Sequence, residues 1–151
     1  MSRSLPWPVR SLIAGVAGTA VLTLSYIAER RVRGSKQPLD YDDSDVPGQI
    51  VASILHISGP SEEEELELGY ALRAAYGSGF GLMHGLLRRR VREPAATLGF
   101  GGALITMTLT MFPLLGHTPP PWRWPRGYLA TCLATHAAYA VTVALVDDRL
   151  P

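Results

Sequence analysis

Hydrophobic residues in this chain gather in four long runs, and most charged residues lie between them. The runs cover about residues 12–28, 68–87, 95–116 and 127–146, and each approaches the roughly 20 residues that a helix needs to cross about 30 Å of hydrocarbon. A soluble bundle would carry charges on the outer face of every helix, but the third and fourth runs carry none. The pattern predicts an all-α integral membrane protein, a single domain over residues 1–151 whose four transmembrane helices pack as a bundle.

The loop between the first two runs has a helical pattern of its own. Apolar residues at Ile50, Val51, Ile54 and Leu55 share one helical face, and the segment is too short to cross a bilayer. We expect a short amphipathic helix at about residues 47–58, lying in the membrane interface. With four crossings, seven basic residues lie on one side of the membrane and six on the other, so the overall charge count hardly favours either orientation. The dense cluster from Arg88 to Arg92 lies in the shortest loop, which favours cytoplasmic termini.

The second run contains Gly77, Gly81 and Gly85, spaced four residues apart. Interior glycines cost a water-exposed helix about 1 kcal/mol each, whereas in a bilayer they let a second helix approach closely. These three residues predict a helix-packing groove. Small residues recur on single faces of the other runs as well, for example Gly99, Ala103, Thr106 and Thr110 in the third. Four tightly packed helices leave no room for a wide aqueous pore within one chain.

Two ionisable side chains share the glycine face of the second run, namely Arg73 and His84. Intramembrane ionisable residues are costly and mark either a functional site or a buried ion pair. We predict a polar intramembrane site formed by Arg73, His84 and Glu29, with Glu29 at the end of the first run as the partner of Arg73. Structural pairing is the simpler interpretation, snorkelling of Arg73 to the interface is a second, and proton or solute transfer is a third.

A proline-rich and aromatic turn joins the third run to the fourth. Trp122, Trp124, Arg123 and Arg126 are residues that the headgroup region favours, and we interpret them as an interfacial anchor. The preceding string Phe112-Pro113-Leu114-Leu115-Gly116-His117-Thr118-Pro119-Pro120 resembles that of the YagU-like family of uncharacterised bacterial inner-membrane proteins. This resemblance covers the third run and the start of the fourth. It implies a small multi-pass protein of the bacterial inner (cytoplasmic) membrane and no catalytic residues.

Candidate chemistry adds little to this picture. The chain has 47% hydrophobic residues, a net charge of +1 and a single cysteine, Cys132, so no intrachain disulfide can form. No zinc pattern, dinucleotide loop or nucleophile with a readable base occurs, and His84 and His136 differ in expected depth, which disfavours one haem between them. We therefore predict no catalytic residues, metal or cofactor of its own, although a haem shared with another chain remains open.

The function that these features favour is a non-catalytic accessory or oligomer-forming membrane component. Its partners would be the lipid bilayer and either further copies of itself or another membrane protein, with no role for nucleic acid. The alternative is a small proton or solute channel or transporter that uses the Arg73 and His84 groove.

Overall fold

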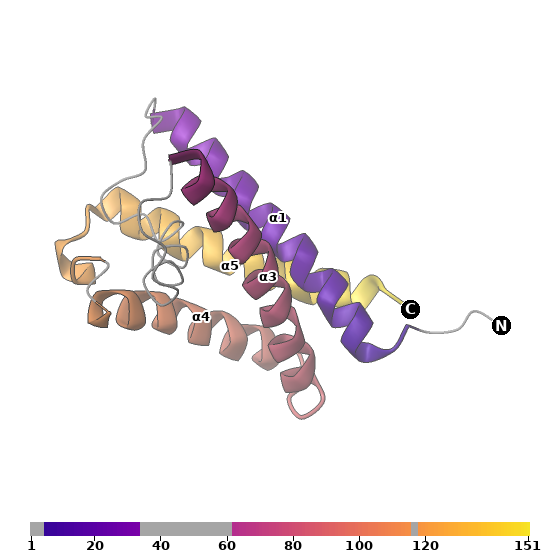
Figure 1. Cartoon of the computed structure of the whole chain (residues 1–151). Helices are drawn as coiled ribbons and strands as arrows, with labels where there is room; N and C mark the ends of the chain where they lie inside the picture. Colours follow the sequence, from indigo (N-terminus) through magenta and orange to yellow (C-terminus); the bar gives the residue numbers. More distant parts are fainter. Residues whose placement is uncertain (1–4, 34–61, 116–117) are drawn as a thin grey trace.

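The computed structural model describes residues 5–33, 62–115 and 118–151, and within these ranges every regular element is helical (Figure 1). The elements are α1 (Trp7–Arg33), α3 (Glu62–Arg88), α4 (Ala95–Leu114), the 3-10 turn η1 (Pro121–Arg123) and α5 (Arg126–Arg149). Prolines stand at the start of three helices, with Pro8 in the first turn of α1, Pro94 before α4 and Pro125 before α5. A proline suits this place because the first amides of a helix have no intrahelical acceptor.

Three helices are long and apolar enough to cross a membrane, over Trp7–Val32, Ala95–Leu114 and Arg126–Arg149. This finding confirms a helical protein with candidate membrane spans. The fourth predicted crossing, at 68–87, falls within α3. This helix is not among the three candidate spans, because its glycines, Arg73 and His84 lower its mean hydropathy. The crossing by α3 stays a prediction. The predicted interfacial helix at 47–58 lies outside the described residues.

The helix α1 holds the bundle together because it packs against both α3 and α5 (Figure 1). The helix α4 packs against α5 and α3, and it has the smallest buried share of the three candidate spans. The segment just before α1 meets the segment just after α5, where the Leu5 amide donates a hydrogen bond to the carbonyl of Pro151 at 2.7 Å. The start of α1, the turn from α3 to α4 and the end of α5 therefore share one end of the bundle.

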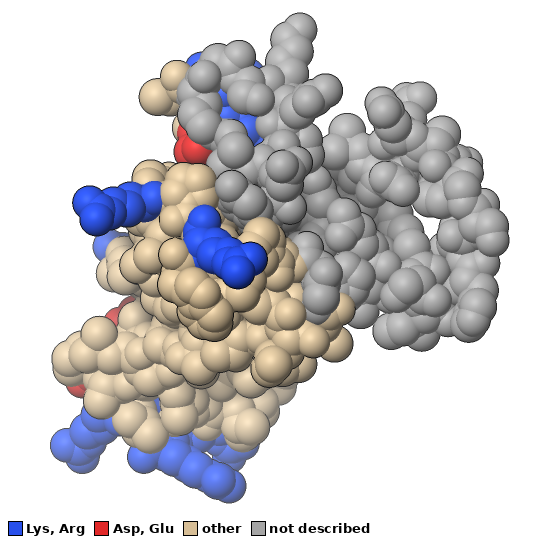
Figure 2. All heavy atoms as spheres, turned by 90° about the vertical axis from the view of Figure 1, so that its left-hand side faces the viewer, with Lys and Arg blue, Asp and Glu red and all other residues tan. Residues whose placement is uncertain are grey.

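The core between these helices is aromatic and aliphatic. Phe100 of α4 and Tyr139 of α5 lie at its centre, and Ala14 and Val143 are fully buried beside them. A second, smaller cluster of Trp124, Tyr128 and Cys132 lies at the start of α5. On the face drawn in Figure 2, basic side chains gather at the lower edge and at separate places above it, and the broad surface between them is mostly uncharged, with acidic side chains visible at its left edge. Such a surface suits contact with lipid.

The contact between α1 and α3 is made by the glycines of α3. A methyl group added at Gly81 would collide with the Ser11 carbonyl and would lie 2.7 Å from the Cα of Gly15, and one added at Gly77 would collide with the Thr19 hydroxyl. Gly85 faces Ser11 in the same way. On the opposite helix, a methyl group at Gly15 would lie 2.6 Å from the Ser78 carbonyl. The two backbones are thus in direct contact where Gly81 and Gly15 meet, and the short side chains of Thr19 and Ser11 fill the space at Gly77 and Gly85 on either side, as small residues permit in membrane helices.

We expect Gly81→Ala to destabilise the protein by about 1–3 kcal/mol, because the new methyl group meets backbone atoms of α1 that cannot move independently of the helix. Thermal unfolding of purified protein in a mild detergent measures this effect. The control is Gly79→Ala on the same helix, where nothing lies within 4 Å of the added atom. It should be neutral or stabilising by up to about 1 kcal/mol. Equal melting temperatures for the two variants would contradict the close α1–α3 contact.

Candidate functional site

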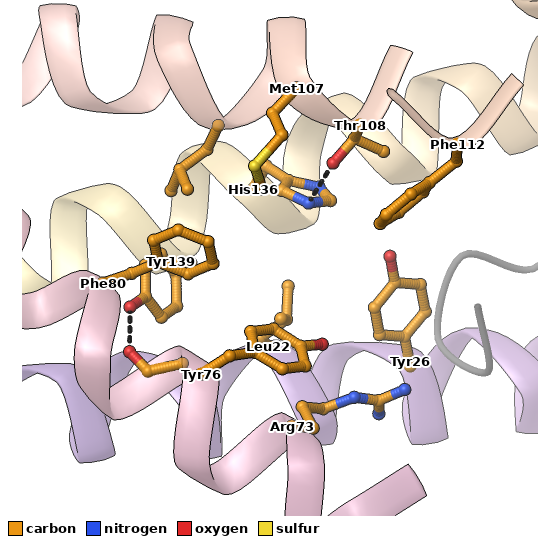
Figure 3. A pocket seen from close by; sticks show the side chains of 12 residues that line it. Leu22, Tyr26, Arg73, Tyr76, Phe80, Met107, Thr108, Phe112, His136 and Tyr139 are labelled. Atoms are coloured by element: carbon orange, nitrogen blue, oxygen red, sulfur yellow. Dashed lines mark hydrogen bonds between the residues drawn. The ribbon is translucent and has the colours of Figure 1, made fainter. Parts of the chain in front are cut away.

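A small pocket lies at the centre of the bundle, between all four long helices (Figure 3). Leu22 and Tyr26 of α1 and Arg73, Tyr76 and Phe80 of α3 form one side, and residues from α4 and α5, among them Leu104, Met107, Thr108, Phe112, His136 and Tyr139, form the other. The free volume is about 40 Å³. A volume of this size has room for a few water molecules.

Arg73 is the charged residue of this pocket. Its side chain is 6% exposed, and the carbon of its guanidinium lies 5.5 Å from the centre of the Tyr26 ring. A guanidinium above an aromatic face is attracted by the ring's negative electrostatic surface. Glu29 lies on α1, about one turn beyond Tyr26, and is partly buried. Its predicted pairing with Arg73 stays a prediction.

His136 lies on the opposite wall, and its two ring nitrogens have different partners. Nδ1 lies 2.8 Å from the carbonyl oxygen of Cys132, so it must carry the proton that this oxygen accepts. Nε2 then accepts a hydrogen bond at 3.1 Å from the Thr108 hydroxyl (Figure 3). Nearby, the Tyr139 hydroxyl donates to the Gly77 carbonyl at 2.5 Å. The hydrogen bonds of this wall therefore fix one tautomer, assigned from the network.

A second polar site lies at the end of the bundle where Leu5 and Pro151 meet, and Arg88 is its centre. The Arg88 guanidinium lies 2.9 Å from Asp147, 2.6 Å from Asp148 and 3.4 Å from Glu93. Arg10 of α1 binds the other oxygen of Asp147 at 2.8 Å. The Asp147 side chain is 1% exposed, so its charge is neutralised by two arginines from two different helices. We call Arg10, His84, Arg88, Glu93, Asp147 and Asp148 the ion cluster.

His84 and Glu93 form the inner part of the ion cluster. His84 is fully buried, and its Nε2 lies 3.2 Å from Glu93. Partial burial raises the pKa of Glu93, but two hydrogen bonds from Thr97, with His84 and Arg88 nearby, outweigh it, and the pKa lies below its ordinary value. Glu93 therefore remains an anion at neutral pH and faces both His84 and Arg88.

The pocket and the ion cluster are separated by packed aromatic rings. The His84 ring lies 5.2 Å from that of Phe100, and Phe100 lies 6.0 Å from Tyr139, which lines the pocket. The structure therefore assigns Arg73 and His84 to different sites, although helical periodicity places them on one face of α3. Among the described residues, no group of three histidine, cysteine, aspartate or glutamate side chains converges in a way that could hold a metal ion.

The residues of the predicted interfacial anchor differ in exposure. Trp122, Arg123 and Arg126 are exposed, whereas Trp124 is 5% exposed and packs edge-on against Tyr128. Its indole N–H donates to the Pro119 carbonyl at 2.8 Å, so this ring is held inside the protein by packing and by a hydrogen bond.

Sequence reasoning missed Asp147, Glu93 and His136 as site residues. Asp147 follows directly after an apolar run, where an acidic residue is normally a solvated helix end. The signal that could have identified it is topological. In a bundle of four antiparallel helices, Arg10, Arg88 and Asp147 come to the same end, so a buried carboxylate there would have two cations within reach.

We expect Asp147→Asn to destabilise the protein by up to about 3 kcal/mol, because two arginines would lose their shared buried anion. The control Asp148→Asn removes a neighbouring carboxylate that also contacts Arg88 but is 55% exposed, and it should cost no more than about 1 kcal/mol. Unfolding in detergent at neutral pH measures both. A larger loss for Asp148→Asn than for Asp147→Asn would overturn the assignment of Asp147 as the central anion.

Glu93→Gln should remove part of the loss of folding stability that the protein undergoes at acidic pH. Because the folded-state pKa of Glu93 lies below its ordinary value of 4.5, its ionised form stabilises the protein above about pH 4.5, and this contribution is lost as the pH falls through the folded-state value. The difference in unfolding free energy between the wild type and Glu93→Gln should therefore shrink between about pH 6 and about pH 3. Unfolding of both proteins across this range tests the sign, and a constant difference would contradict it.

Comparison with protein-family models, curated proteins and solved structures returns no match to this chain. The resemblance to the YagU-like family therefore stays a prediction from one string of residues. What supports a function is the geometry of the two sites and of the helix surfaces around them.

Proposed function

We propose that this chain is a multi-pass, non-catalytic membrane component that associates with copies of itself through α4. The observation that carries the proposal is the surface of α4. This helix has the smallest buried share of the three candidate spans, and its small residues Gly99, Gly102, Ala103, Thr106 and Thr110 are exposed. Nothing lies within 4 Å of an atom added at Gly102.

The two sets of small residues have different surroundings. The glycines of α3 are already occupied by α1, whereas the small residues of α4 face away from the bundle. In a bilayer there is no hydrophobic drive between helices, so close backbone approach over small residues is a main source of association. A second copy of α4 is the simplest complementary surface, because symmetric dimers bring the same patch of each subunit together.

The helix α3 and the arginines that follow it bear on how the chain crosses the membrane. We propose that residues 68–87 form a fourth crossing, since α3 packs along α1, which is itself a candidate span. Arg89, Arg90 and Arg92 lie at the turn after α3, at the same end of the bundle as Leu5 and Pro151. This favours cytoplasmic termini in a bacterial inner membrane, with the segment 47–58 as an interfacial helix.

The alternative of a proton or solute conductor finds less support. It required Arg73 and His84 to act in one groove, but packed rings of Phe100 and Tyr139 lie between their two sites. A flux assay in liposomes separates the two functions, because Arg73→Ala with His84→Ala abolishes flux in a conductor and has no flux to abolish in a packing protein.

We expect Thr106→Cys, placed in a Cys132→Ser background, to form disulfide-linked dimers in membranes under mild oxidation. Thr106 lies at the middle of α4 on its exposed face, so symmetric association would bring two copies together. The matched control is Ala137→Cys, which is exposed at the middle of α5 and should remain monomeric. Gel electrophoresis without reductant reads out both variants. Equal cross-linking of the two positions, or none at Thr106→Cys, would reject α4 as the interface.

A further inference from the structure

The arginines at the α3–α4 end of the bundle fall into two groups. Arg10 and Arg88 belong to the ion cluster, whose carboxylates bind them. The second group follows directly after α3 and has exposed side chains, and we call it the arginine turn: Arg89, Arg90 and Arg92. Within residues 5–33, 62–115 and 118–151, none of these three lies at ion-pair distance from a carboxylate. The arginine turn therefore presents three positive charges that the described residues do not neutralise.

The arginine turn is held in place by contacts of its own. The amide of Arg90 donates to the carbonyl of Leu87 at 2.9 Å, so the backbone continues the hydrogen bonding of α3 beyond its last residue. The guanidinium of Arg89 lies 5.3 Å from the centre of the Trp7 ring on α1, where the face of the indole attracts the cation. The positive charges are therefore gathered at one place instead of being spread over a free loop.

The ends of all three candidate spans lie beside the arginine turn. One span starts at Trp7, one starts at Ala95 and one ends at Arg149. The hydrogen bond between Leu5 and Pro151 and the ion cluster join these ends (Figure 1). When these helices cross a bilayer, this end of the bundle lies at the boundary between hydrocarbon and headgroups, where tryptophan and arginine are favoured.

The side of α3 that leads to the arginine turn is apolar. Met83 is 57% exposed and Leu86 is 53% exposed. They precede Arg90 by seven and four residues, a spacing that places them on the same side of the helix. An apolar surface that ends in a group of cations matches an amphiphile with a negative head and hydrocarbon chains.

We propose that the arginine turn binds the phosphate of an anionic phospholipid, with the acyl chains lying along Met83 and Leu86. Guanidinium groups bind phosphate oxygens through paired, charge-assisted hydrogen bonds. Basic residues next to a membrane span favour anionic over zwitterionic lipids, because a zwitterionic headgroup carries a cation of its own. The proposal rests on the membrane crossing that the proposed function also assumes, and it is independent of self-association through α4.

The test is equilibrium binding of three probes to the full-length protein in a mild detergent. Dioleoyl phosphatidylglycerol and dioleoyl phosphatidylcholine share their chains and phosphate and differ in net charge, and glycerol phosphate has no chains. We expect saturable binding of about one phosphatidylglycerol per chain, and at least about tenfold weaker binding of phosphatidylcholine. Absence of saturable phosphatidylglycerol binding, or equal affinity for the two lipids, overturns the proposal. Equal affinity for glycerol phosphate overturns the role of the acyl chains.

Variants then connect binding to the arginine turn. Binding of phosphatidylglycerol should weaken at least about tenfold when the three charges are removed together, in Arg89→Gln, Arg90→Gln and Arg92→Gln. Lysine at the same three positions should weaken it less, because the charge is kept. The matched control removes three exposed arginines at the opposite end of the bundle and should leave the affinity unchanged: Arg31→Gln, Arg123→Gln and Arg126→Gln. Wild-type affinity in the first triple variant, or an equal loss in the control, overturns the proposal.

If the first triple variant does not fold, Met83→Gln with Leu86→Gln keeps the test decisive, because all arginines stay in place. It should also weaken phosphatidylglycerol binding about tenfold, since the acyl chains would lose two apolar side chains. An unchanged affinity in this folded variant overturns the proposed position of the chains. Self-association through α4 is measured separately by cross-linking, so either proposal can fail without the other.

Discussion

The backbone contact between α1 and α3 sets the relative position of the polar side chains that these two helices bring together in the described part of the chain. Gly77, Gly81 and Gly85 lie against Thr19, Gly15 and Ser11, and this antiparallel register fixes which residues meet further along the pair. In one direction it brings Arg73 to the ring of Tyr26, and in the other it brings Arg89 to the ring of Trp7. A larger residue at the contact would separate the helices and shift both pairs. The glycines thus determine which side chains meet at positions outside the glycine contact itself.

The ion cluster extends this arrangement to α5. Burying a carboxylate such as Asp147 costs several kcal/mol in an apolar environment unless its charge and lone pairs are matched. Arg10 and Arg88 match both oxygens, and they come from the two helices whose register the glycines set. Arg88 also contacts Asp148 and Glu93, so one guanidinium joins α3, the turn before α4 and the end of α5. Because these contacts depend on all three elements being in place, the cluster favours one bundle arrangement over looser alternatives.

Hydrophobic patterning predicted the last two helices closely, at 95–116 and 127–146 against Ala95–Leu114 and Arg126–Arg149. It is less accurate for α1, because the apolar run 12–28 marks the part suited to lipid while the helix continues into charged ends. Periodicity placed Arg73 and His84 on the glycine face, and both are buried. It could not show that they belong to different sites, since that depends on Phe100 and Tyr139 from other helices. The Arg10–Asp147 pair joins residues 137 positions apart, a separation for which local patterns carry no information.

The two polar sites differ in a way that bears on what the protein can do. In the ion cluster, cations and anions are matched within the chain and the groups are close-packed, which suits a structural role. The central pocket keeps about 40 Å³ of free volume beside a buried arginine that packs on the Tyr26 ring, so it is less closely packed than the ion cluster.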